Sequence, residues 1–232
     1  MEFPEDFNQL ELLDTHEHLI PRGPTSSWTA SKDEEEEVDE EPHSEEWYHE
    51  KEEALKDEPK ELILWAAENN RLTTVLHLLA ADSLLVHFCD EDGYTPLHRS
   101  AYSGHVEVVR TLLDAGSMVN HRTVDGWTPL HSACRWSHVA VASCLLRYGA
   151  QLNAQTNGGL TPLHLAASHS NSSKPNTAHI LEFLLSNRNL KPGVRSSSGE
   201  TAGDVARRSG PYDFLFEMVE DCVNVVPFVT AS

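Results

Sequence analysis

The chain has few residues of several kinds, and each shortage narrows what the protein can be. It has 4 cysteines among 232 residues. None of them forms a Cys-x-x-Cys pair, so the sequence predicts free thiols in a reducing compartment rather than a disulfide framework. It has 17 basic residues against 37 acidic ones, a formal net charge of −20. Direct nucleic-acid binding is not expected, because clustered lysine and arginine must neutralise the phosphate backbone.

Long apolar runs are also missing. No stretch approaches the ~18 residues that a membrane-spanning helix needs. The chain begins with acidic residues, whereas a secretion signal begins with basic residues followed by apolar ones. We therefore expect an intracellular protein that does not enter a membrane. No basic cluster marks nuclear import, so entry into the nucleus would depend on small size or on a carrier.

The motifs of familiar enzyme classes are absent as well. The sequence contains no Gly-x-Ser-x-Gly, no Gly-x-x-x-x-Gly-Lys-Ser/Thr and no His-Glu-x-x-His. The carboxylates near the N-terminus are plentiful, but a mobile chain cannot hold two acids at a working separation. We predict a protein with no catalytic residues, no cofactor and no metal ligands.

The acidic residues are concentrated at one end. Residues 1–57 hold 20 acidic and 4 basic residues, a balance of −16, whereas residues 58–232 hold 17 and 13, a balance of −4. A block with this charge repels itself and buries too little apolar surface to fold. We therefore predict a disordered acidic leader over residues 1–57, followed by a folded body.

The body repeats one phrase at a fixed distance. Gly-x-Thr-Pro-Leu-His occupies residues 93–98, 126–131 and 159–164, so each copy begins 33 residues after the previous one. Gly suits a tight turn, Thr can cap a helix, and Pro suits the first helical position. In the first copy, Gly104 is predicted to end one helix and Gly116 a second one. A turn plus two helices cannot bury its apolar faces alone, so the units must stack.

This phrase, followed by Gly-His-x-x-Val-Val-x-x-Leu-Leu at residues 104–113, resembles the ankyrin repeat family. The resemblance covers about residues 58–220. It implies an all-α ankyrin-repeat solenoid of helix–turn–helix units with β-turn fingers. The expected repeats are 58–89, 90–122, 123–155, 156–195 and 196–220, and residues 221–232 form a tail that we expect to pack on the last helix. The two end repeats are degenerate, as units that face water on one side should be.

The third copy of the phrase belongs to a longer repeat. Thr161 to Leu185 spans 24 residues where Thr95 to Leu113 spans 18. The six-residue difference falls near residues 169–177, between the two helices. We interpret it as a surface excursion, with a longer binding loop as the alternative.

The recurring histidines invite a metal-site interpretation, which the spacing argues against. His98, His131 and His164 would lie one repeat apart, roughly 8–10 Å in packed helices. Zinc needs its nitrogen ligands at about 2.0–2.1 Å. We predict instead that each histidine fixes its turn to the start of the following helix.

Positions that differ between repeats are the candidates for function. The resemblance implies that a partner protein binds through the turn tips and first helices, which line a concave surface. The residues expected there are Tyr94, Arg99, Tyr102, Trp127, Arg135, Trp136 and Leu160. Tyrosine, tryptophan and arginine are enriched at binding hot spots. The alternative is that Trp127 and Trp136 pack on neighbouring repeats and stiffen the array.

The leader holds a second candidate site. Phe3, Phe7, Leu10 and Leu13 alternate with acidic residues, which is the composition of activation segments. Phe3, Phe7 and Leu10 also fit the spacing of a groove-binding helix. We predict a docking motif here, in a monomeric interaction protein that regulates transcription or differentiation in the nucleus. The alternative is a cytosolic adaptor or chaperone-like scaffold whose leader only solubilises it.

The resemblance also implies a modification. Some ankyrin arrays are hydroxylated at the asparagine that closes each repeat, and Asn120 and Asn153 match that position. Met118 and Gln151 stand where an acidic residue commonly precedes the modified asparagine.

Overall fold

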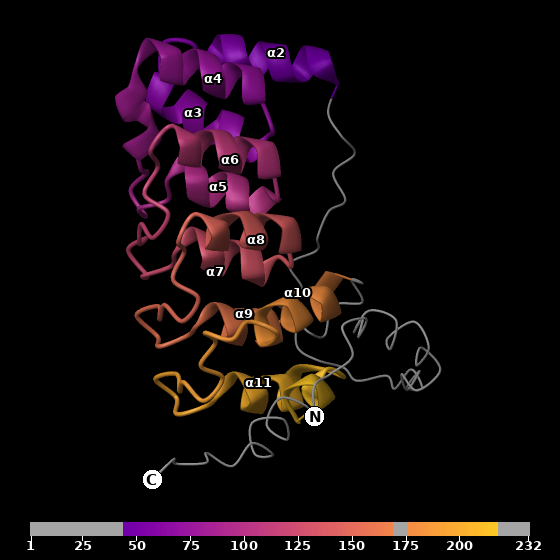
Figure 1. Cartoon of the computed structure of the whole chain (residues 1–232). Helices are drawn as coiled ribbons and strands as arrows, with labels where there is room; N and C mark the ends of the chain where they lie inside the picture. The colour runs from indigo at the N-terminus through magenta and orange to yellow at the C-terminus, as the bar shows by residue number, and fades with distance from the viewer. Residues whose placement is uncertain (1–43, 169–175, 218–232) are drawn as a thin grey trace, which may run out of the picture. The chain divides into compact units, whose positions relative to one another are not determined.

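The structure is a computed structural model that describes residues 44–168 and 176–217. Its helices follow one another down a stack in chain order (Figure 1). They are α2 (Glu45–Ala54), α3 (Pro59–Glu68), α4 (Leu72–Ala81), the 3-10 helix η2 (Ser83–His87), α5 (Pro96–Ser103), α6 (Val106–Asp114), α7 (Pro129–Arg135), α8 (Val139–Arg147), α9 (Pro162–Ser168), α10 (Asn176–Leu185) and α11 (Ala202–Ser209). The leader motif of Phe3, Phe7, Leu10 and Leu13, most of the insert near 169–177 and the tail 221–232 lie outside the described residues.

The repeat at 90–122 has the predicted local structure. Thr95 is extended and caps α5, with Pro96 in the first turn. Gly104 follows α5 with a φ of +82°, a left-handed conformation that glycine adopts at little cost. The second helix, α6, then begins at Val106. The turn signals in the sequence therefore mark the helix ends as predicted.

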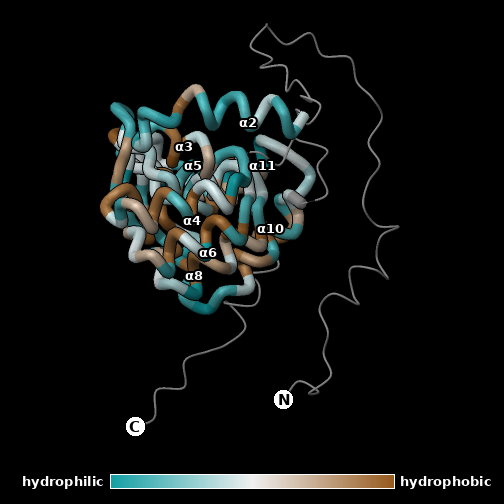
Figure 2. The backbone as a smooth tube through the Cα atoms, turned by 90° about the horizontal axis from the view of Figure 1, so that it is seen from above, coloured by the Kyte–Doolittle hydropathy of each residue, from teal (hydrophilic) through white to brown (hydrophobic). Residues whose placement is uncertain are grey.

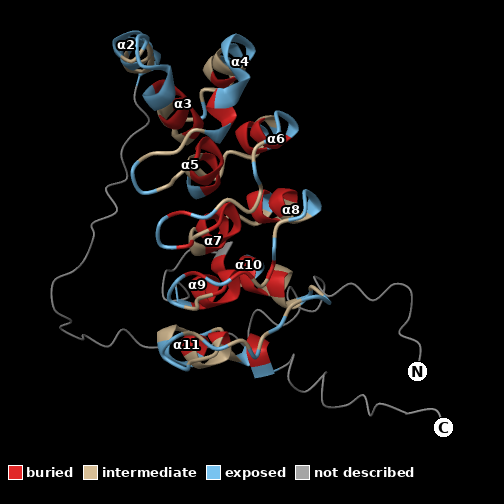
Figure 3. Cartoon of the chain, turned by 90° about the vertical axis from the view of Figure 1, so that its left-hand side faces the viewer, coloured by how far each residue is buried: buried red, intermediate tan, exposed pale blue. Residues whose placement is uncertain are grey.

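The helices form two layers. First helices pack on first helices in the order α3, α5, α7, α9, α11, and second helices pack in the order α4, α6, α8, α10. The turns project on the side of the first helices (Figure 3). The repeated leucines Leu97, Leu130 and Leu163 lie between the layers, each at most 2% exposed. This burial is what stacking provides and a single repeat lacks.

The structure differs from the predicted leader over residues 44–57, which include helix α2. Ser44 caps it by accepting a hydrogen bond from the backbone N–H of Trp47. Trp47 and Tyr48 lie against Trp65 of α3, with ring centroids 6.2 and 6.1 Å away. Most of the helix is hydrophilic (Figure 2). Overall composition favoured disorder here, but the helix carries two aromatic residues that contact the array.

Ion pairs hold α2 to the first repeat as well. Arg71 donates to Glu45 at 2.9 Å and to Glu52 at 3.0 Å, and its guanidinium lies 5.2 Å from the centroid of the Tyr48 ring. Thr74 also donates to Glu52. Burial raises the pKa of Glu52, but the hydrogen bonds from Thr74 and Arg71 outweigh it, so the pKa lies below its usual value of 4.5. Helix α2 thus belongs to the folded array.

In the part of the chain that the structure describes, no helix has the length and hydropathy of a membrane span. The longest of the helices given above, such as α2 and α3, have 10 residues. That corresponds to about 15 Å, half the ~30 Å hydrocarbon thickness of a bilayer.

Candidate protein-binding face

The repeated histidines connect each turn to the next repeat. The Nδ1 atom of His98 accepts the backbone N–H of Thr95 at 3.3 Å, and its Nε2 atom lies 3.2 Å from the carbonyl oxygen of Trp127, in the following turn. Because Nδ1 accepts, the proton sits on Nε2, which donates to that carbonyl. His131 bonds Leu160 in the same way at 3.1 Å. The prediction that the histidines fix the turns is therefore confirmed, and each also bonds to its neighbouring repeat.

These histidines are held neutral. Burial lowers the pKa of His98 and of His131 from 6.5 to about 4. It also lowers the pKa of His164, whose Nε2 lies 3.1 Å from the carbonyl oxygen of Glu200. A second proton on Nδ1 would oppose the N–H group that this atom now accepts, so protonation breaks the turn.

The repeat that contains α11 has the same helix cap, but an aspartate stands in place of the histidine. Asp204 stands where the other repeats have histidine, and it accepts from the backbone N–H of Thr201 at 2.9 Å and from its hydroxyl at 2.8 Å. A carboxylate has no N–H to donate onward. Within the described residues, Asp204 therefore caps its own helix and makes no bond to a following turn.

A second set of side chains bonds backwards along the stack. His105 and His138 precede α6 and α8 as their cap residues. Their Nε2 atoms donate to the carbonyl oxygens of Glu68 and Tyr102, both at 2.8 Å. Arg71 occupies the same position before α4. It too bonds backwards, to Glu45 and Glu52 of α2.

The asparagines that close the repeats are also engaged. The side chain of Asn120 donates to the carbonyl oxygen of Gly149 at 3.1 Å and accepts the N–H of Gln151 at 2.8 Å. Asn153 makes the corresponding pair of bonds with Asn189 and Lys191, both at 2.8 Å. Both amides therefore join consecutive repeats, and their hydroxylation stays a prediction.

We call the face formed by the turns and the first helices the inner face. Three of the residues predicted to bind a partner, Tyr94, Arg99 and Tyr102, line a cavity of about 300 Å³ on it, together with Glu68. Tyr94 comes from the turn, Arg99 and Tyr102 from α5, and Glu68 from the end of α3. The cavity therefore lies between the first and second repeats.

Carboxylates position Arg99 in this cavity. Its guanidinium donates to Asp90 at 2.8 Å and to Glu68 at 3.4 Å, and lies 5.3 Å from the centroid of the Tyr94 ring. Asp90 also accepts the backbone N–H of Tyr94 at 2.7 Å. The sequence interpretation did not identify Glu68 or Asp90. Both lie outside the repeated phrase, and only the stacking brings Glu68 to Arg99.

A second cluster adjoins the cavity through Tyr102. The ring of Trp136 meets that of Tyr102 edge to face, with centroids 4.9 Å apart, and Arg135 lies 5.5 Å from the Trp136 centroid. Trp136 therefore packs on a neighbouring repeat, as the alternative interpretation stated, and extends the surface around Tyr102. Trp127 and Leu160 do not line the cavity. Their carbonyl groups accept the histidine bonds.

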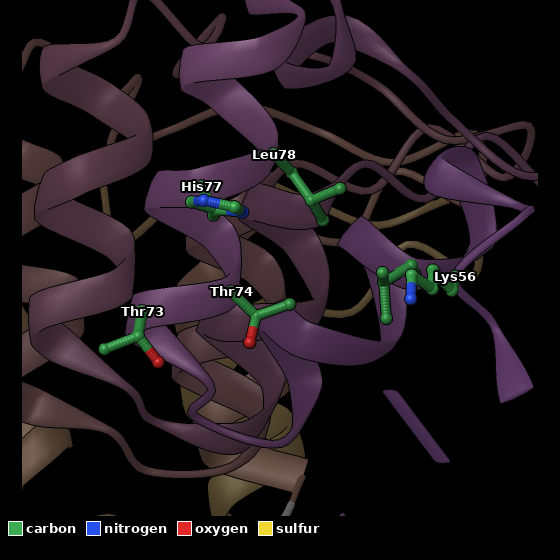
Figure 4. A pocket seen from close by; sticks show the side chains of 6 residues that line it. Lys56, Thr73, Thr74, His77 and Leu78 are labelled. Carbon is green, nitrogen blue, oxygen red and sulfur yellow. The ribbon is translucent and has the colours of Figure 1, made fainter. Parts of the chain in front are cut away.

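A larger cavity, of about 470 Å³, lies away from the inner face. Figure 4 shows its lining, in which Lys56 follows α2 and Thr73, Thr74, His77 and Leu78 come from α4. In the described ranges no group of three or more histidine, cysteine or acidic side chains could hold a metal ion. The inner-face cavity is thus the place where predicted binding residues converge.

Known proteins resemble this chain along nearly its whole length. A family model described as ankyrin repeats (3 copies) matches residues 63–156 and 116–196. The chain is 59% identical to Ankyrin repeat domain-containing protein 49 of Bos taurus and 58% identical to that of Homo sapiens over 227 residues, 98% of this chain and 92% of each relative. The protein of the same name from Drosophila melanogaster is 46% identical over 206 residues, 88% of this chain and 87% of the relative. The similarity therefore includes the region before the repeats.

Proposed function

The chain belongs to the ankyrin repeat family, and from that premise we propose that it is a non-enzymatic regulator that holds a partner protein on its inner face. Ankyrin repeats mediate protein–protein interactions, so the interaction role follows from the family. The location of the site is our proposal. The observation that carries it is the cavity in which Tyr94, Arg99 and Tyr102 converge.

The composition of the inner face supports this location. Tyr102 is 44% exposed, next to Trp136 and Arg135, and these three residue types dominate binding hot spots. The repeated histidines His98, His131 and His164, in contrast, are buried, and His98 and His131 form hydrogen bonds with the next repeat. The histidines are thus committed to the stack, whereas Arg99 and Trp136 contact neighbouring repeats and also lie on the inner face.

A photo-crosslinking amino acid at a single position tests the site. We place it at Tyr102 on the inner face and, as a matched control, at Tyr148, which follows α8 and is 41% exposed. We expect cell-derived partner proteins to crosslink at position 102 and not at position 148. Equal crosslinking at both positions, or crosslinking at 148 alone, contradicts the inner-face site.

We further propose that the protein acts as a monomer in the nucleus, in the regulation of transcription or differentiation, with the leader as an activation or docking segment. The acidic–hydrophobic pattern around Phe3 and Phe7 supports this role. The test attaches residues 1–57 to a DNA-binding module and measures a reporter gene. We expect activation that is lost when Phe3 and Phe7 are changed to alanine. The absence of a reporter response would leave the leader as a solubilising segment, and a response that ignores both changes would remove Phe3 and Phe7 from the docking motif. Imaging of the full chain in cells checks the location.

A further inference from the structure

The described residues that line the cavity on the inner face include one carboxylate, Glu68, and one cation, Arg99. Asp90 adds a second carboxylate beside them, and both acids face the Arg99 guanidinium. Farther out, Asp92 and Asp125 add negative charge near the Tyr94 hydroxyl, whose pKa is raised by burial and then by these carboxylates. An anionic group entering here would meet repulsion, whereas a cation would be attracted.

Glu68 is the carboxylate that can accept a further partner. Asp90 accepts a hydrogen bond from Arg99 at 2.8 Å. The Glu68 carboxylate lies 3.4 Å from the same guanidinium, and 36% of its side chain is exposed. One Glu68 carboxylate oxygen makes no hydrogen bond within the described residues. Its backbone is fixed, because His105 donates to its carbonyl group at 2.8 Å. The Glu68 carboxylate is therefore positioned at the cavity with an oxygen that can accept a further hydrogen bond.

Aromatic rings form the other wall. Two rings in or beside the cavity already contact cations of the chain itself. Arg99 lies 5.3 Å from the Tyr94 centroid, and Arg135 lies 5.5 Å from the Trp136 centroid. Tyr102 lines the same cavity and is 44% exposed. A cation beside an aromatic face and a carboxylate gains from both.

We propose that this cavity binds one basic side chain, a lysine or an arginine, of the partner polypeptide. Glu68 is its counter-ion and Tyr102 its aromatic wall. The volume of about 300 Å³ lies at the lower end of ligand sites, which suits one long side chain. This inference depends on the proposed function, because it names the chemistry of a partner at the inner face.

The probe is a phage-displayed library of random twelve-residue peptides, selected on the full chain. We expect the enriched peptides to share a lysine or arginine. For one such synthetic peptide, changing that residue to methionine should weaken binding about tenfold. Glu68→Gln should weaken the unchanged peptide to a similar degree and barely affect the methionine peptide, because the two changes remove the same contact.

Glu107→Gln is the matched control. Glu107 contacts Arg110 at 3.4 Å on an exposed part of α6, the same distance as the pair of Glu68 with Arg99. We expect it to leave peptide binding unchanged. Melting curves of both variants must match that of the parent chain, so that a loss of binding reports the site and not the fold.

Three outcomes overturn the inference. The first is enrichment of peptides without a basic residue, the second is no enrichment at all, and the third is independent effects of the methionine change and Glu68→Gln. If any of them occurs while Tyr102→Ala still abolishes binding of an enriched peptide or the crosslink at position 102 persists, the inner-face site stands and only its chemistry is wrong. If Tyr102→Ala affects no enriched peptide and position 102 gives no crosslink, the proposed function fails too.

Discussion

The centre of the array and its N-terminal end bond to their neighbours with different chemistry. In the centre, neutral imidazoles such as His98 and His131 bond to carbonyl groups of the next turn. At the N-terminal end, the first repeat lacks the repeated phrase, and Arg71 bonds to the carboxylates of Glu45 and Glu52. Aromatic contacts of Trp65 with α2 complete this end.

The difference shows how a repeat array can end. A central repeat meets a copy of itself, so the same buried hydrogen bond can recur in every interface. In the part of the chain that the structure describes, the first repeat has no earlier copy to meet, and its partner is a single helix with its own sequence. Its contacts are also partly exposed, because the side chain of Glu45 is 75% exposed. We therefore expect the two regions to respond differently to acid and to substitution.

Acid should separate the two regions most strongly. The folded pKa of about 4 for His98 and His131 lies below the unfolded value of 6.5. Their stabilisation is therefore complete above pH 6.5 and is lost as the pH falls from there toward 4. We expect a loss of about 2 kcal/mol of unfolding free energy for each histidine between pH 7 and pH 5. Urea unfolding at the two pH values measures it.

The N-terminal end should not share this dependence. The pKa of Glu52 is lowered from 4.5, so its contribution is present above pH 4.5 and is lost only below it. The control is a chain with His98→Gln and His131→Gln, which should lose less stability between pH 7 and pH 5. An equal loss in the parent and the variant would contradict the assignment to these two histidines.

Removal of one central imidazole should have the next largest effect. His131→Ala leaves the Leu160 carbonyl and the Thr128 N–H without their partners in a buried turn. We expect a loss of about 3 kcal/mol from the unmet hydrogen bonds and the cavity. Asp204→Ala removes bonds only within its own turn and helix, to Thr201 and to the exposed Arg207, and should cost clearly less. Chemical denaturation of both variants makes the comparison, and equal losses would contradict it.

The ion pairs of the N-terminal end should contribute less than the central histidine. Arg71→Met keeps the apolar stem of the side chain and removes its bonds to Glu45 and Glu52. We expect a loss of about 1–2 kcal/mol, because the pairs are only partly buried. Arg110→Met, in an exposed pair with Glu107, is the control and should be nearly neutral. Hydrogen exchange should show the loss of protection from Arg71→Met in α2 before the central helices.

Two glycines give the smallest and most local test. Gly126 and Gly149 both have left-handed backbones, with φ of +81° and +88°. A Cβ at Gly126 would lie 2.6 Å from the Asn157 side-chain oxygen and 2.9 Å from its backbone nitrogen, whereas none meets an atom within 4 Å at Gly149. We expect Gly149→Ala to cost about 1 kcal/mol from the backbone alone and Gly126→Ala about 1 kcal/mol more. Equal melting temperatures for the two variants would refute the difference.

Much of the fold was predictable because the phrase is local. Thr95 and Pro96 start α5 and Gly104 follows its end through preferences that depend on a few neighbouring residues. The 33-residue spacing then requires the units to stack. Helix α2 was missed because average charge over residues 1–57 concealed Trp47 and Tyr48. Their partner, Trp65, lies in another helix.

The candidate site was predictable only in part. Tyr94, Arg99 and Tyr102 could be identified as positions that vary between repeats, and the structure places them around one cavity. Glu68 could not be identified in this way, because it ends α3, the first helix of a repeat that lacks Gly-x-Thr-Pro-Leu-His. Whether Trp136 packs or binds also depended on the distance to Tyr102, a residue 34 positions earlier in the chain.

The sequence by itself determined the repeat unit, its helix ends and the role of its histidines in fixing the turns, because turn, cap and spacing are properties of short segments. Only the tertiary structure decided which side chains meet across repeats. Glu68 reaches Arg99, and Arg71 reaches α2, because stacking brings residues from separate helices within bonding distance. That stacking also buries the repeated histidines and leaves the Tyr102 side chain exposed.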